Sequence, residues 1–138
     1  MATMQGGCLC GKVRYSTAAD PIFTGVCHCH NCQKETGSAF AVSIGVPKPA
    51  LTVTGTLKTY TDKGDSSGQP VFRKFCPECG STVITEVAVM PEVSIIAAGT
   101  LDDTSAVQPG MHIYCASKQD WTDIPAGAKT FPGMPGPG

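Results

Sequence analysis

The sequence predicts an all-β fold, mainly β, built from small packed antiparallel sheets, and three observations support this prediction. Apolar, β-branched or alternating segments of about four to eight residues recur along the chain. Glycine and proline, at 16 and 11 of the 138 residues, punctuate these segments as turn signals. The helical pattern is weak, because only Asn31–Thr36 is typical of a helical turn, which Gly37 would end.

The strands are expected in order along the chain. Lys12–Ser16 alternates, with Val13 and Tyr15 on one face. Ala39–Val46 is apolar and partly β-branched, and Pro47 stops it. The remaining strand candidates are Leu51–Thr54, Thr56–Tyr60, Val71–Phe75, Thr82–Val89, Val93–Gly99 and Met111–Cys115.

The chain length indicates a single domain, which we place at residues 1–130. Residues 131–138 are rich in glycine and proline and are expected to form a flexible tail. A second polar segment, Thr61–Pro70, reads as a loop and a candidate lid over a site.

Composition excludes some function classes. Ten Lys and Arg against eleven Asp and Glu give a formal net charge of −1, which argues against a nucleic-acid partner held by a large basic surface. No apolar stretch approaches the roughly 20 residues that span a bilayer, so no membrane partner is expected. No leader pattern is visible near Met1, and a reducing cytoplasm is the expected compartment.

The chain has eight cysteines, and seven of them lie in three short elements. In a disulfide framework eight cysteines allow 105 pairings. Partners this close in sequence suit one metal ion better than long-range crosslinks. The three elements are Cys8-Leu-Cys10, Cys27-His-Cys29-His-Asn-Cys32 and Cys76-Pro-Glu-Cys79.

The pair Cys76 and Cys79, followed by Gly80, has the form of a zinc knuckle. A closed tetrahedral site needs two more ligands, and Cys8 and Cys10 supply them if the N-terminal strand lies beside the knuckle. Alternate residues of a regular strand share a face, so both thiols would point at one ion. The alternative interpretation of Cys76 and Cys79 is a redox dithiol, which would be expected between the elements of a βαβ unit.

The triplet Cys27, Cys29 and Cys32 offers three thiolates and so leaves one position of a tetrahedral zinc ion open, as in a catalytic site. A water or a substrate thiol would take that position. The alternative is a second closed site, with Cys115, His28 or His30 as the fourth ligand. For Cys115 itself a buried structural thiol is favoured. The sequence therefore predicts two zinc ions per chain, one structural and one catalytic.

A substrate at the second site would need local binding groups. Lys34 and Arg73 are candidate cations, because they lie near the cysteine elements in sequence. Thr36, Gly37 and Ser38 follow the triplet directly and are candidate hydrogen-bond donors to a carboxylate. Trp121 is a candidate pocket wall.

Four segments of the chain resemble one family in the same order. They are GGCLCGKVRY at residues 6–15, CHCHNCQKETGSAF at 27–40, FCPECGSTV at 75–83 and HIYCASKQDWTDIP at 112–125. Together they resemble the glutathione-dependent formaldehyde-activating enzyme family, which also contains centromere-protein-V-like members. The resemblance covers nearly the whole domain, and Cys115 is not one of its motif cysteines.

The resemblance implies a fold of the Mss-four-like type with zinc-ribbon character. It also implies a structural zinc on Cys8, Cys10, Cys76 and Cys79, and a catalytic zinc on Cys27, Cys29 and Cys32. The implied activity condenses glutathione with formaldehyde to S-(hydroxymethyl)glutathione, a carbon–sulfur lyase reaction run in reverse. Two alternatives stay open: cleavage or isomerisation of a different glutathione or thiol conjugate, and a non-catalytic zinc-binding interaction module.

Overall fold

A computed structural model describes residues 3–64 and 67–135 of the chain. It confirms the all-β prediction with two packed sheets. The three-stranded antiparallel sheet has the order β1-β2-β5, and the eight-stranded sheet has the order β11-β10-β3-β4-β9-β8-β7-β6. The strands are β1 (Met4–Gly7), β2 (Arg14–Thr17), β3 (Phe23–Cys27), β4 (Ala41–Pro47), β5 (Thr52–Thr54), β6 (Lys58–Lys63), β7 (Pro70–Phe75), β8 (Thr82–Val87), β9 (Val93–Ala97), β10 (Met111–Ile113) and β11 (Lys129–Thr130).

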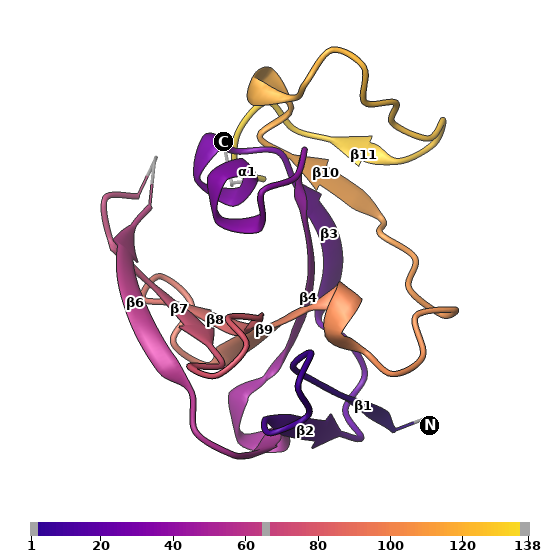
Figure 1. Ribbon diagram of the computed structural model, residues 1–138. Helices are drawn as coiled ribbons and strands as arrows, with labels where there is room; N and C mark the ends of the chain where they lie inside the picture. The colour runs from indigo at the N-terminus through magenta and orange to yellow at the C-terminus, as the bar shows by residue number, and fades with distance from the viewer. Residues whose placement is uncertain (1–2, 65–66, 136–138) are drawn as a thin grey trace.

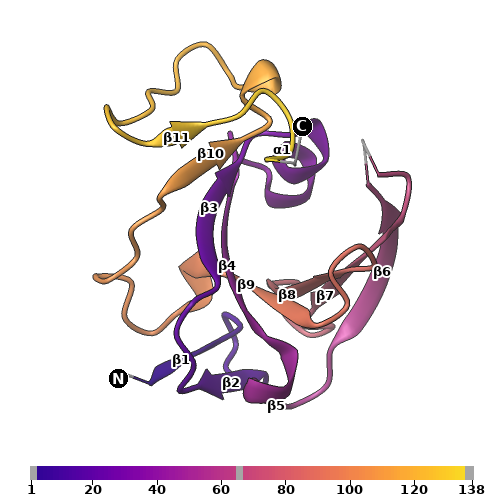
Figure 2. The ribbon, with the colours of Figure 1, turned by 180° about the vertical axis from the view of Figure 1, so that it is seen from behind.

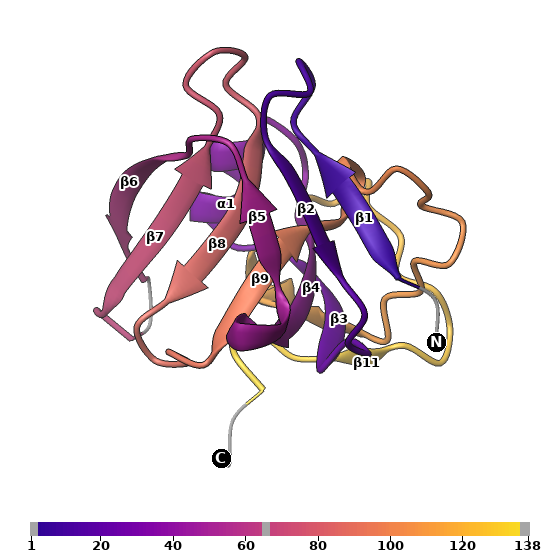
Figure 3. The same ribbon diagram turned by 90° about the horizontal axis from the view of Figure 1, so that it is seen from below.

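The eight-stranded sheet curves from β6 at one end to β11 at the other (Figures 1 and 2). The single α-helix of the described residues, α1 (His30–Thr36), lies on the concave side of this curve. The three-stranded sheet packs across the other side, over β3, β4 and β9 (Figure 3). Short 3₁₀ turns follow β4, β9 and β10 at Lys48–Ala50, Ala98–Thr100 and Cys115–Ser117.

The hydrophobic core lies between the two sheets. Val13 and Tyr15 on the small sheet's side meet Ile44, Ile84 and Ile96 of the large sheet, and all five are buried. Because strand side chains alternate, the neighbouring residues of the same strands point to the opposite, concave face. The large sheet therefore supports the core with one face and leaves the other for a site.

Two strands, β3 and β11, were not expected from the sequence, and the N-terminal strand β1 lies before the cysteine pair that was expected on it. The segment Phe23–Cys27 (FTGVC) shows no alternation, and its pairing with both β4 and β10 fixes it as a strand. The N-terminal strand ends at Gly7, before the first cysteine pair. The expectation that Cys8 and Cys10 alternate on a regular strand is therefore wrong: they lie in the turn that connects β1 to β2, and Gly11 takes a positive φ of 83° there.

Two expected loops are more structured than the sequence indicates. Thr61–Lys63 belongs to β6 and Pro70 to β7, which shortens the expected loop; residues 65–66 of it lie outside the described residues. At the C-terminus Phe131 donates a backbone hydrogen bond to His112, and Tyr114 donates one to Gly133, so the domain extends beyond residue 130. The last residues of the expected tail, 136–138, lie outside the described part of the chain.

Gly37 ends α1 as predicted, in the left-handed conformation with φ 65° and ψ 27°. A Cβ atom at this position would meet no other atom within 4 Å, so only the backbone conformation penalises a side chain. We expect Gly37→Ala to lower the free energy of unfolding by about 1 kcal/mol, measured by urea denaturation. Gly99→Ala is the matched control, because Gly99 is equally open and has no positive φ. Equal losses in the two variants would contradict this account.

Candidate metal centres and the adjoining cavity

Four cysteines meet where the β1–β2 turn lies against the β7–β8 turn. Their four sulfur atoms lie within 4.8 Å of one another. Cys10 Sγ is 3.6 Å from Cys8 Sγ and 3.7 Å from Cys76 Sγ, and Cys79 completes the group. Four thiolates at about 2.3 Å from one zinc ion would lie about 3.8 Å apart. The donor set and its spacing therefore fit a tetrahedral ion.

Hydrogen bonds favour the thiolate form at Cys8 and Cys79 of this four-cysteine group, whereas contacts with the neighbouring thiols help to raise the pKa of Cys10 to about 11. The hydroxyl of Ser81 lies 3.3 Å from Cys79 Sγ, and this contact and the Ser81 backbone lower the pKa of Cys79 to about 5. Burial acts to raise the pKa of Cys8, but the Val13 N–H, 3.3 Å from its sulfur, and the neighbouring thiols lower it on balance. Two of the four sulfurs are thus prepared to bind a cation.

The second group consists of Cys27, Cys29 and Cys32, whose sulfur atoms also lie within 4.8 Å of one another. Cys27 ends β3, and Cys29 is the N-cap of α1, where its sulfur accepts a hydrogen bond from the Cys32 N–H at 3.2 Å. The helix begins here because the extended conformation of Cys29 leaves its side chain free to satisfy that N–H group. Within the described ranges, no fourth cysteine, histidine or carboxylate joins this group.

The three thiols differ in pKa, so they differ in how readily each loses its proton. Hydrogen bonds from Cys27 and Cys32 lower the pKa of Cys29 to about 2, which favours the thiolate form of Cys29. The same contact raises the pKa of Cys27 to about 12, and both neighbours raise the pKa of Cys32. A bound divalent cation would replace the remaining two protons, because thiols that coordinate such an ion are deprotonated. The donor set thus fits a metal with one ligand position left open.

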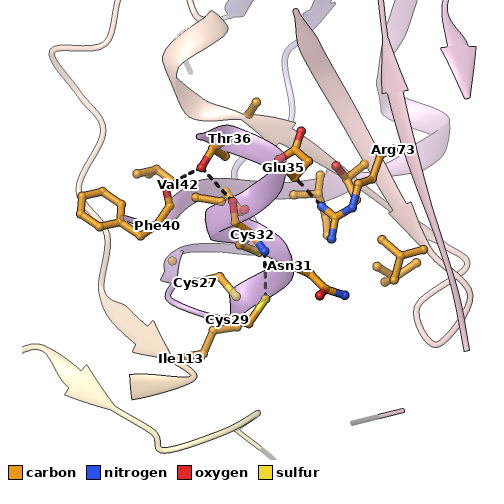
Figure 4. Close-up of a pocket in the computed structure, with 18 of the residues that line it drawn as sticks. Cys27, Cys29, Asn31, Cys32, Glu35, Thr36, Phe40, Val42, Arg73 and Ile113 are labelled. Atoms are coloured by element: carbon orange, nitrogen blue, oxygen red, sulfur yellow. Dashed lines mark hydrogen bonds and ion pairs between the residues drawn. The ribbon is translucent and has the colours of Figure 1, made fainter. Parts of the chain in front are cut away.

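The three-cysteine group borders a cavity of about 770 Å³ on the concave face of the large sheet (Figure 4). Alternate residues of its strands face this space: Cys27 and Ile113 stand side by side from β3 and β10, and Ile95 and Thr85 from β9 and β8. The volume falls in the range of small-molecule sites. The arrangement brings a soft, anionic sulfur cluster to the wall of a pocket.

A charged link crosses one side of the cavity and joins α1 to β6 and β7. Arg73 of β7 contacts Asp62 at 3.1 Å and Glu35 at 3.9 Å (Figure 4 shows Arg73 and Glu35). Asn31, one helical turn before Glu35, donates hydrogen bonds to the Asp62 carboxylate and to the Lys63 backbone oxygen. Burial acts to lower the pKa of Arg73, but Cys32 and the two carboxylates raise it on balance. Arg73 therefore stays charged beside the sulfur cluster.

A network of amides fixes the other side of α1. Gln33 donates to the backbone oxygens of His28 and Ser117 at 2.9 and 3.0 Å. Its own oxygen accepts a hydrogen bond from Gln119 at 2.9 Å, and Trp121 donates to Gln119 at 2.6 Å. The segment from Ser117 to Trp121 thus positions the helix that carries Cys32, although the indole of Trp121 is 70% exposed.

The predicted substrate-binding residues divide into two sets. Arg73 and Thr36 line the cavity, although the Thr36 hydroxyl already donates to the Cys32 backbone oxygen at 2.8 Å. Four residues are absent from the described lining of the cavity, and all four are exposed: Lys34, Gly37, Ser38 and Trp121.

His28 and the eighth cysteine, Cys115, form hydrogen bonds away from the three-cysteine group. His28 is fully buried, and its Nε2 lies 3.0 Å from His112 Nδ1. Cys115 is half-buried, and its thiol donates to the His112 backbone oxygen at 3.4 Å. Neither His28 nor Cys115 belongs to the cysteine groups of the described residues.

Sequence reasoning missed Glu35, Asn31 and Asp62. The signal for Glu35 was helical spacing, because residues three apart lie on one helix face and Glu35 follows Cys32 by three. Lys34, which was predicted as a substrate-binding residue instead, is only two residues from Cys32 and does not line the cavity. Asp62 carried no such signal, because its place beside Arg73 depends on the β6–β7 register, in which Tyr60 rather than Asp62 is the direct partner of Arg73.

Comparisons with known proteins point to one family. A family model described as glutathione-dependent formaldehyde-activating enzyme matches residues 3–117. A curated protein of Emericella nidulans, named as a putative glutathione-dependent formaldehyde-activating enzyme, is 35% identical over 75 residues. That match covers 53% of this chain, and the chain spans only 36% of the relative's length.

The fold also occurs among solved structures. The crystal structure of a Rhodobacter sphaeroides protein superimposes with a TM-score of 0.59 over 75% of this chain and 92% of that one. At 21% sequence identity this similarity concerns the fold alone. Among the described residues, no helix has the length and apolar character required to cross a membrane.

Proposed function

We propose, since the chain belongs to the glutathione-dependent formaldehyde-activating enzyme family, that it is a zinc-dependent carbon–sulfur lyase of the S-(hydroxymethyl)glutathione synthase type. In the proposed reaction the sulfur of glutathione adds to the carbonyl carbon of formaldehyde, and the thiol proton ends on the oxygen. The observation that carries the proposal is a group of three cysteines, with no fourth ligand among the described residues, on the wall of a cavity.

Two zinc ions per chain are part of the proposal. The four-cysteine group would hold a closed, structural ion, and Cys27, Cys29 and Cys32 would hold the second. When bound there, zinc supplies Lewis acidity and a binding position for a thiolate. We further propose that the protein works in the cytoplasm, where thiols stay reduced and available for metal binding.

The surrounding residues hold the site and adjust its charge. The N-cap contact at Cys29 and the Gln33 amide network fix the positions of the cysteines on and before α1. Arg73 places a positive charge near Cys32, which stabilises anionic sulfur. For substrate binding we retain Arg73 and Thr36, which line the cavity, whereas Lys34, Gly37, Ser38 and Trp121 would act only at its exterior.

The test combines metal analysis with exchange spectroscopy. We expect the purified protein to contain two zinc ions per chain and to accelerate exchange between formaldehyde and its glutathione adduct, followed with ¹³C-labelled formaldehyde by NMR. A chelator that removes the ion at the three-cysteine site should abolish the acceleration, and added zinc should restore it. An exchange rate equal to that of the protein-free mixture would contradict the proposal.

A further inference from the structure

The cavity is apolar over most of the sheet face that forms it. β3, β7, β8, β9 and β10 each contribute at least one apolar side chain to the lining, and these come mainly from alternate positions. The apolar residues from these strands are Phe23, Val71, Val87, Ile95, Ala97, Met111 and Ile113. They belong to no part of the hydrophobic core between the two sheets. We call this lining the apolar chamber.

Charge is nearly absent from the chamber. Among the described residues that line the cavity outside the three-cysteine group, only Arg73 and Glu35 are charged, and Arg73 is already paired with Glu35 and Asp62. These three side chains together carry a net charge of −1, so no uncompensated positive charge faces the cavity from them. The two carboxylates of a glutathione molecule would find no unpaired cationic side chain among the described lining residues to replace their hydration.

The size of the chamber is also out of proportion to a one-carbon substrate. About 770 Å³ of space adjoins the three sulfur atoms, and a hydroxymethyl group would leave most of it unfilled. Apolar surface gains free energy only when an apolar group replaces water on it. The chamber therefore matches a larger apolar substituent on the substrate sulfur, with the charged glutathione portion outside it.

Resting on the proposed function, we infer that the preferred substrates are thiol adducts whose sulfur-bound group is large and apolar, such as those of long-chain or aromatic aldehydes. The sulfur lies at the three-cysteine group, and its apolar substituent occupies the chamber between β10 and β7. The hydroxymethyl adduct binds in the same orientation but leaves the chamber filled with water.

The test measures binding of two stable thioethers, S-methylglutathione and S-hexylglutathione, to the zinc-loaded protein by calorimetry. The two ligands share every charge and differ by five methylene groups. Each buried methylene is worth a factor of about four in affinity, so S-hexylglutathione should bind at least tenfold more tightly and at most about a thousandfold. Exchange of the formaldehyde adduct is measured on the same sample.

A substitution that fills part of the chamber with a larger side chain tests whether the apolar group of the ligand binds there. Ala97 faces the chamber from β9, so Ala97→Leu should reduce the affinity ratio of the two thioethers at least fivefold. Ala50→Leu makes the same change at an exposed position outside the lining and should leave the ratio unaltered.

The outcomes separate this inference from the proposed function. Equal affinities, or a ratio unaffected by Ala97→Leu, overturn the inference, and catalysed formaldehyde exchange in that sample keeps the proposed function. If neither thioether binds and exchange is not accelerated, both are overturned. A ratio above ten that falls in Ala97→Leu supports the apolar chamber as the substrate pocket.

Discussion

Replacing Cys29 with serine is expected to lower the catalysed exchange of the glutathione–formaldehyde adduct by more than about 100-fold. Loss of partners that only orient metal ligands typically costs 10–100-fold, and a ligand itself should cost more. Bound zinc should fall by one ion per chain, because two thiols remain at a site that has three. The measurements are the NMR exchange rate and metal content by mass spectrometry.

The serine substitution keeps the local structure. Cys29 is the N-cap of α1, and serine is a favoured N-cap residue, so the helix and the cavity wall should remain. An unchanged circular dichroism spectrum checks this. The matched control is Cys115→Ser, which removes a half-buried thiol outside both cysteine groups and should keep both ions and the exchange rate. Full activity in Cys29→Ser would remove the three-cysteine site from the mechanism.

The second large effect concerns stability. Cys10→Ser is expected to lower the melting temperature by at least about 10 °C, although Cys10 is exposed. An exposed substitution normally changes stability by less than about 0.5 kcal/mol. A structural zinc ion contributes about 10–16 kcal/mol in zinc-finger peptides, so weakening one of its four ligands should cost several kcal/mol, which corresponds to this shift.

A control separates the metal from packing. Leu9, between the two N-terminal cysteines, is 88% exposed, so Leu9→Ser changes the same turn without touching a ligand and should leave the melting temperature within about 2 °C. Thermal melts in excess chelator should bring the wild type to the level of Cys10→Ser. If Cys10→Ser and Leu9→Ser melt together, the four-cysteine group has no structural ion.

The grouping of the cysteines could be predicted because ligand spacing is a local property of the sequence. Two residues between Cys76 and Cys79 fix how two thiols face one ion, whatever surrounds them. The pairing of this knuckle with Cys8 and Cys10 was predicted on the wrong local structure, since these residues lie in a turn and not on a strand. The four sulfur atoms nevertheless lie together, as the need for four ligands predicts.

The cavity could not be predicted, because it results from pairing between distant strands. β3 gives no alternating signal and becomes a strand only between β4 and β10. Arg73 was predicted because it lies near the knuckle in sequence. Its contacts with Glu35 and Asp62 could not be predicted, because the three residues lie on separate elements, β7, α1 and β6. The Gly/Pro-rich residues after Thr130 were expected to be flexible, yet Phe131 and Gly133 hydrogen-bond to the segment after β10.

The parallel pairing of β10 with β3 also sets the order of events during synthesis. Met111 is the partner of Gly25, so 86 residues separate the two sides of the site's wall. The chain emerges from the ribosome N-terminus first, and Cys27, Cys29 and Cys32 appear together long before Ile113 and Ser117 do. The three thiols are therefore available to bind an ion on the nascent chain before Ile113 and Ser117, which complete the wall beside them, have been synthesised.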